Sequence, residues 1–143
     1  MELRRMVMGQ MANNERCVSG NFTVPDGISS YKISIGKTIN NYVWYVEMSE
    51  VSKSALMATG SSEKKAYAFL GKYPTPQIDN KSISSTSFWS FRVTPSTQEI
   101  NTLIGYVSSI DNTGITIGAG GVGGAANALV KGYTYNYYIY EIE

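Results

Sequence analysis

The sequence of 143 residues contains no histidine and a single cysteine. Without histidine, the Ser-His-Asp and Cys-His catalytic arrangements, histidine-ligated metal sites and the usual general base near neutral pH are all excluded. A lone cysteine allows neither a disulfide within the chain nor a thiolate zinc cluster. Because no base is available to activate it, Cys17 is expected to be a small strand residue and not a reactive thiol.

Charged residues are also scarce, at 16% of the chain compared with about a quarter in an average protein. The net charge is +1 and no basic run occurs, so no nucleic-acid partner is expected. The carboxylates that lie nearest in sequence are Glu47 with Glu50 and Glu141 with Glu143. Neither pair belongs to a catalytic or metal-binding motif. The chain is therefore predicted to be non-enzymatic, with no cofactor and no metal.

Long hydrophobic runs are missing as well. No stretch approaches the length of a transmembrane helix, so no membrane insertion is expected. Residues 1–14 place Leu3, Met6, Val7 and Met11 near one face of a helix. This segment is too short and interrupted to be a signal peptide. It is expected to be a helical or extended connector, with its apolar side covered by other copies of the chain in a homo-oligomer, a trimer being favoured.

From residue 15 onward, short apolar or alternating runs are separated by turn residues such as Pro25-Asp26-Gly27 and Asp111-Asn112-Thr113-Gly114. No helical period separates the runs, and strands at such spacing are typical of an antiparallel sandwich or barrel. Residues 15–143 are therefore predicted to form an all-β domain, an antiparallel β-sandwich of jelly-roll-like type. The predicted strands are 17–24, 31–36, 41–48, 54–60, 65–72, 85–94, 103–109, 113–118 and 133–142.

The strand predicted at 41–48 is apolar on both sides, which indicates a central strand covered on both faces. The last strand carries several of the eleven tyrosines. A tyrosine at the edge of a core packs its ring and pairs its hydroxyl, whereas an exposed group of tyrosines forms a surface for binding sugars or proteins. For any single tyrosine, packing at the core edge is the favoured interpretation.

Residues 118–123 read Gly-Ala-Gly-Gly-Val-Gly, which matches the G-x-G-x-x-G of dinucleotide-binding folds. That motif requires a crossover helix and a parallel sheet, but the residues that follow allow barely two helical turns before Gly132. The motif also normally begins such a domain, whereas here it lies near the end of the sequence. We expect a flexible Gly/Ala loop that joins two antiparallel strands, in a place where loops often bind ligands.

Three segments together resemble a domain of phage and prophage tail fibre or appendage proteins of Gram-positive bacteria. They are "LRRMVMGQMANNERCVSGNFTVPDGISSYKISIG" (3–36), "INNYVWYVEM" (39–48) and "GYTYNYYIYEIE" (132–143). Ser19 to Thr23 occupy the position of a T-G-x-F-T strand, and Tyr133 to Tyr140 that of a closing aromatic strand. Tyr137 and Tyr138 depart from the pattern, because tryptophan is commoner there, as does the charged Glu141.

The resemblance implies a β-sandwich at the distal end of a fibre, often trimeric, that contacts the host surface in the virion. It implies no catalytic residues. Polar, low-charge surfaces with aromatic rings suit glycan binding, so a host-surface glycan is the expected ligand. A bacterial carbohydrate-binding module and a purely structural virion or adaptor protein are the alternatives. From residue type, the candidate ligand-binding residues are the exposed members of the aromatic set Trp44, Tyr73, Tyr138 and Tyr140, together with Gly118, Gly120 and Gly123 of the glycine loop.

Overall fold

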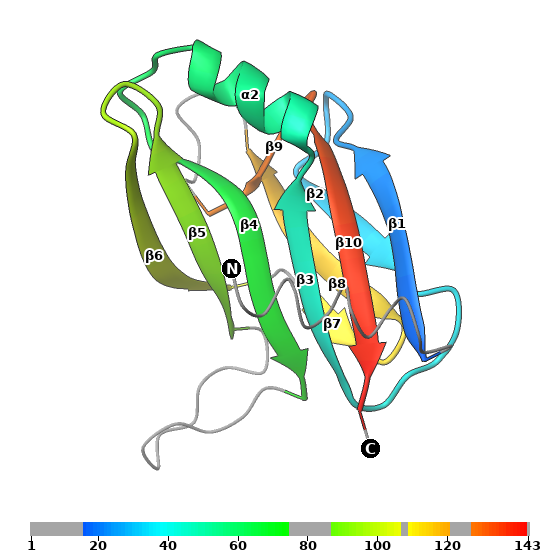
Figure 1. Ribbon diagram of the computed structural model, residues 1–143. Helices are drawn as coiled ribbons and strands as arrows, with labels where there is room; N and C mark the ends of the chain where they lie inside the picture. Colours follow the sequence, from blue (N-terminus) through cyan, green and yellow to red (C-terminus); the bar gives the residue numbers. More distant parts are fainter. Residues whose placement is uncertain (1–15, 75–86, 107–108, 121–126, 143) are drawn as a thin grey trace.

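The computed structural model describes residues 16–74, 87–106, 109–120 and 127–142. Within these ranges the chain forms two stacked β-sheets with one short helix, α2 (Glu50–Ala58), lying across one end (Figure 1). The predicted all-β sandwich is therefore confirmed. The predicted connector at 1–14 lies outside the described residues.

The larger sheet has six strands, and all of its neighbouring strands are antiparallel. The strands β3 to β6 follow one another as a meander, and β10 is inserted between β1 and β3. The edges of the sheet are therefore β1 and β6. This order differs from the two four-stranded sheets of a regular jelly roll. Across the sheet, the strands are β1 (Cys17–Thr23), β10 (Thr134–Glu141), β3 (Tyr42–Met48), β4 (Lys65–Tyr73), β5 (Ser87–Thr94) and β6 (Glu99–Tyr106).

The smaller sheet has four strands and is centred on β8 (Gly114–Gly120). β2 (Ser30–Ser34) and β7 (Ser109–Asp111) pair with β8 in antiparallel fashion. The short β9 (Leu129–Val130) runs parallel to β8, with Ala119 opposite Leu129. β9 is the next described strand after β8 and runs parallel to it, so the expected connection between two antiparallel strands is wrong.

The core lies between the two sheets and is rich in aromatic rings. Phe22 of the larger sheet stacks on Tyr31 of the smaller sheet, with ring centroids 4.4 Å apart and planes 9° apart. The buried hydroxyl of Tyr42 donates a hydrogen bond of 2.9 Å to the carbonyl oxygen of Asp111, which also links the two sheets. β3 is buried along nearly its whole length, and its central place in the sheet confirms the prediction made from its sequence.

The predicted strand at 54–60 is wrong, because these residues lie in or just after helix α2. Ser49 caps the helix: its side-chain oxygen accepts a hydrogen bond of 3.2 Å from the backbone N–H of Ser52. Gly60, with φ of +62°, follows the last turn and reverses the chain direction. The helix buries only Leu56. A helix of nine residues with one buried side chain leaves little periodicity in the sequence.

Every other predicted strand overlaps an observed one, with shifts at the ends. The largest shift is at 103–109, because β6 begins four residues earlier at Glu99 and β7 begins separately at Ser109. Cys17 is the first residue of β1 and is partly buried, as expected for a small strand residue. Burial raises the pKa of its thiol above the ordinary value, which disfavours the reactive thiolate.

Candidate functional site

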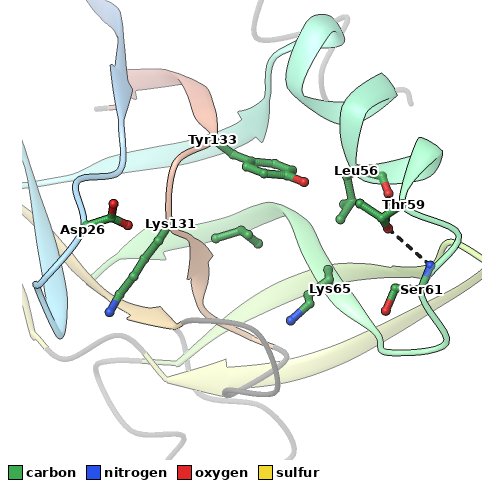
Figure 2. Close-up of a pocket in the computed structure, with 8 residues that line it drawn as sticks. Asp26, Leu56, Thr59, Ser61, Lys65, Lys131 and Tyr133 are labelled. Carbon is green, nitrogen blue, oxygen red and sulfur yellow. Dashed lines mark hydrogen bonds between the residues drawn. The ribbon is translucent and has the colours of Figure 1, made fainter.

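A cavity of about 420 Å³ opens at the end of the sandwich, beside the C-terminal end of α2 (Figure 2). It lies where four segments meet: the turn after β1, the end of α2, the first residue of β4 and the connection from β9 to β10. The described residues that line it are Asp26, Leu56, Thr59, Ser61, Lys65, Val130, Lys131 and Tyr133.

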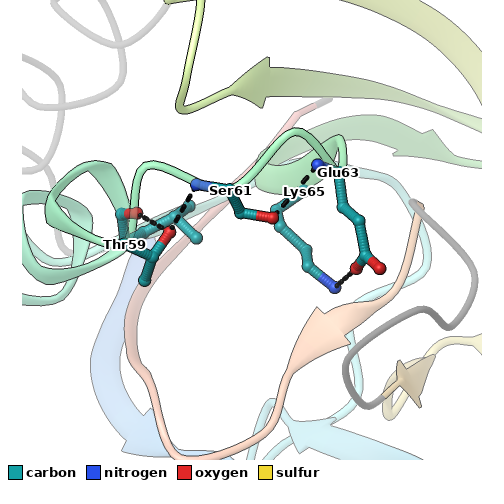
Figure 3. A network of polar contacts seen from close by, with 5 residues as sticks. Thr59, Ser61, Glu63 and Lys65 are labelled. Atoms are coloured by element: carbon teal, nitrogen blue, oxygen red, sulfur yellow. Dashed lines mark hydrogen bonds and ion pairs between the residues drawn. The ribbon is translucent and has the colours of Figure 1, made fainter.

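One wall of the cavity is a chain of polar contacts that begins at the C-terminal cap of α2 (Figure 3). The Thr59 hydroxyl donates a hydrogen bond of 2.7 Å to the carbonyl of Leu56 and accepts one of 3.3 Å from the backbone N–H of Ser61. The Ser61 hydroxyl in turn accepts a hydrogen bond of 3.0 Å from the backbone N–H of Glu63. The carboxylate of Glu63 pairs with the ammonium of Lys65 at 3.2 Å. These contacts hold two hydroxyls and one ammonium in place along the wall.

The opposite wall is the tight turn between β9 and β10. Gly132 adopts a positive φ of +85° and donates its N–H to the carbonyl of Val24 at 2.8 Å. Tyr133 donates its N–H to the carbonyl of Val130 at 3.3 Å, and its own carbonyl accepts a hydrogen bond of 3.1 Å from Val24. The backbone on both sides of Tyr133 is therefore fixed, and its ring projects toward Leu56 and Thr59 (Figure 2).

The chemistry of the lining is mixed. Leu56 and Val130 supply apolar surface, Tyr133 supplies a half-buried aromatic ring, and Lys131 brings a second ammonium. Asp26 is the one carboxylate among the described lining residues, so they do not include the pair of carboxylates that glycoside hydrolysis needs. Such a set suits a polyhydroxylated ligand, because a ring can stack on a sugar face while hydroxyls and ammonium groups bind its oxygens.

Among the predicted site residues that the structure describes, none lines this cavity. Trp44 is 1% exposed and packs in the core against Phe88, so it is not one of the exposed members of the predicted set. Tyr138 is 9% exposed and stacks on Tyr45, so it is also unavailable as an exposed ring. Trp44 belongs to the main core, and Tyr138 to a second buried cluster with Tyr45 and Ala68.

The remaining predicted residues are scattered over the fold. Tyr73 and Tyr140 are half-buried at the ends of β4 and β10, and Tyr73 packs against Tyr42. Gly118 and Gly120 are strand residues of β8 and not loop residues, which corrects the expected loop over these positions. Gly123 lies outside the described residues. The described residues after the glycine run, 127–142, contain β9 and β10 and no helix, so the dinucleotide-binding pattern has no structural counterpart there.

Sequence reasoning identified two of the segments that build the cavity, but for other reasons. Pro25-Asp26-Gly27 was recognised as a turn and Tyr133 as the start of the last strand. Helix α2 is the element that the sequence analysis does not predict, although Ser49 and Gly60 signal its two ends. Because α2 supplies one wall, its absence from the predicted fold concealed the site.

Comparisons with protein-family models, with curated proteins and with solved structures found no match to this chain. In the part of the chain that the structure describes, no helix is long and apolar enough to span a membrane. The same ranges contain no group of three or more histidine, cysteine, aspartate or glutamate side chains able to hold a metal ion.

Proposed function

We propose that this chain is a non-enzymatic binding domain of a phage or prophage tail fibre or appendage, and that it contacts glycans of the host cell surface. The motifs of the sequence support the virion role. The observation that carries the binding role is the cavity beside α2, which the Tyr133 ring lines together with Thr59 and Ser61.

The cavity favours a glycan over other small ligands for a physical reason. A sugar ring presents an apolar face and a rim of hydroxyls, and an aromatic ring with hydrogen-bonding groups around it complements both. Lys131 and Lys65 add positive charge, while Glu63 and Asp26 offset part of it. We therefore propose a neutral or weakly acidic cell-wall polysaccharide as the ligand class.

The test is binding of oligosaccharides released from the cell wall of a Gram-positive host, measured by calorimetry with the full chain and a Tyr133→Ala variant. Loss of the stacking ring is expected to weaken binding about tenfold, corresponding to about 1.4 kcal/mol. Trp89→Ala is the matched control, because Trp89 is an exposed aromatic residue that does not line the cavity. Its affinity is expected to equal that of the wild-type chain.

Equal binding by the wild-type chain and Tyr133→Ala would contradict the site, and binding lost only in Trp89→Ala would relocate it to the sheet face. Binding of no cell-wall fraction would favour the structural virion role. A bacterial carbohydrate-binding module differs from the proposed protein only in its origin, so the presence of tail-assembly genes beside the coding sequence distinguishes the two.

A further inference from the structure

The edge strand β6 carries an unusual set of exposed side chains. Among the described residues it pairs only with β5, so its other side is the free edge of the six-stranded sheet (Figure 1). Ile100 is 62% exposed, and Leu103 and Ile104 are each 39% exposed. These three apolar residues lie within five positions of one strand.

Natural proteins normally protect such an edge. Lysine or proline on the strand, a bulge, or a very short strand prevents another chain from adding to the sheet. β6 has eight residues and contains no lysine, arginine or proline. Its pairing with β5 is regular from Glu99 to Tyr106. The edge is therefore long, regular and apolar, which are the properties that allow another strand to pair with it.

The apolar surface extends from the edge onto the face of the sheet. Ile104 lies directly opposite Trp89 of β5, and Trp89 is 43% exposed. Strand side chains alternate between faces, so Ile100, Thr102 and Ile104 share the face of Trp89, whereas Asn101 and Leu103 lie on the other face. An added strand would therefore find apolar partners on both faces.

We propose that β6 pairs with β6 of a second copy of this chain, in antiparallel fashion, across a two-fold axis through Thr102. The sequence from 100 to 104 is Ile-Asn-Thr-Leu-Ile, which is nearly symmetric about Thr102. A two-fold interface brings one surface onto an identical surface, so it must be complementary to itself. β6 meets this requirement, whereas a strand evolved for an unrelated partner has no reason to be symmetric.

The register follows from the same symmetry. With Thr102 opposite itself, Ile100 of each copy lies opposite Ile104 of the other, and Asn101 lies opposite Leu103. Glu99, the one charged residue of β6, then lies opposite Gly105, so no like charges meet.

Moving the axis by one residue gives a poorer fit. An axis through Asn101 places Ile100 opposite Thr102 and Glu99 opposite Leu103. An axis through Leu103 places Ile104 opposite Thr102 and Asn101 opposite Gly105. Only the axis through Thr102 pairs both isoleucines with isoleucines, and pairs of β-branched residues stabilise neighbouring strands. In the resulting dimer the two six-stranded sheets form one continuous sheet, independently of any ligand in the cavity.

The first measurement is the molar mass of the full chain by sedimentation equilibrium over a dilution series. We expect a two-chain mass that falls to one chain on dilution. A one-chain mass at the highest concentration, or a three-chain mass, would overturn the proposal.

The second measurement uses the residue that meets its own copy. Thr102→Lys places two positive charges opposite each other at the axis, and Thr102→Glu places two negative charges there. Each variant alone is expected to dimerise at least about tenfold more weakly. An equal mixture of the two variants is expected to recover the dimer, because opposite charges then meet. This recovery cannot arise if either variant is misfolded.

Asn21→Lys is the matched control, since Asn21 is an exposed residue on β1, the opposite edge strand of the same sheet. Its dimer is expected to be as stable as that of the wild-type chain. Dimers that are unchanged by both Thr102 variants, or lost in Asn21→Lys alone, would place the interface elsewhere and overturn the proposal.

Discussion

The centre and the β6 edge of the larger sheet have the same kinds of residues in different surroundings. One row of directly opposed residues crosses five strands on the face that points away from the smaller sheet, and we call it the outer row. Tyr45 and Tyr138, on β3 and β10, are 2% and 9% exposed, whereas Trp89 and Ile104, on β5 and β6, are 43% and 39% exposed. From β10 to β6, the outer row consists of Tyr138, Tyr45, Leu70, Trp89 and Ile104.

This difference shows that residue type and strand register do not determine exposure. Each member of the outer row is apolar or aromatic and lies on a strand of the same sheet. The central members form a second buried cluster with Ala68, apart from the main core. Trp89 and Ile104 lie on β5 and on the edge strand β6, and their exposed apolar surface is a sign of an interaction site.

The largest expected difference in stability is between alanine substitutions of the two tryptophans. Trp44→Ala removes a fully buried ring from the core and is expected to lower the free energy of unfolding by about 3–5 kcal/mol. Trp89→Ala removes an exposed ring and is expected to cost less than about 1 kcal/mol. Denaturant unfolding of both variants, at a concentration where the chain is monomeric, provides the comparison. Equal losses would mean that the margin of the sheet is as tightly packed as its centre.

The next largest difference in stability is expected between alanine substitutions at two strand glycines, Gly71 and Gly118. A Cβ atom on Gly71 would lie 2.6 Å from the ring of Trp44, so Gly71→Ala is expected to destabilise the fold by about 1–3 kcal/mol. At Gly118, the nearest heavy atom would be 3.9 Å away. Gly118→Ala is therefore expected to be neutral or slightly stabilising, because alanine reduces the freedom of the unfolded chain. Unfolding curves for the two variants test this, and a similar loss at both sites would contradict close packing against Trp44.

A smaller effect is expected from a single buried hydroxyl. The Tyr135 hydroxyl accepts a hydrogen bond of 2.9 Å from the backbone N–H of Val130, the residue that precedes the lysine of the cavity wall. Tyr135→Phe leaves that N–H without its acceptor and is expected to cost about 1–2 kcal/mol near neutral pH. Tyr137→Phe, on the same face of β10 but half-buried, is the control and is expected to cost less. A larger loss in the control would contradict the role of this hydrogen bond.

The same hydroxyl predicts a pH dependence. Burial raises the pKa of Tyr135 above its ordinary value near 10. Above about pH 10 the unfolded chain loses this proton while the folded chain keeps it, so stability falls as the pH rises, by at most about 1.4 kcal/mol per pH unit. In Tyr135→Phe this contribution is absent, and the alkaline fall is expected to be shallower. Unfolding curves at neutral pH and above pH 10 measure the slope, and equal slopes would contradict the prediction.

The fold could be predicted largely because each strand has its own local pattern. The strand predicted at 41–48 is apolar on both sides, which indicates a strand covered on both faces, and β3 is central in the sheet. Helix α2 could not be recovered from periodicity, because it buries only Leu56. Its N-cap Ser49 and Gly60, the glycine after its C-cap, are the available signals. The parallel pairing of β9 was also not predictable, since two paired residues leave no pattern in a sequence.

The candidate site was much less predictable than the fold. Choosing aromatic residues by type selected Trp44 and Tyr138, which the structure buries, and did not select Tyr133 as part of a cavity. The reason is that the cavity forms from four segments that are distant in sequence. Only their arrangement brings the Tyr133 ring close to Leu56 and Thr59 (Figure 2).

By itself, the sequence determined the chemistry that this chain can use and most of its strands. A chain without histidine and with one cysteine cannot use whole classes of catalysis. Alternating apolar and polar residues, bounded by turn residues, indicate where the strands lie. The sequence determines both because residue content and strand pattern do not depend on the packing of distant segments. Tertiary structure alone decided which rings are buried, which strand is an edge and where a cavity opens. These properties depend on the packing of distant segments, since the exposure of a side chain is set by its neighbours in space and not by its neighbours in the chain.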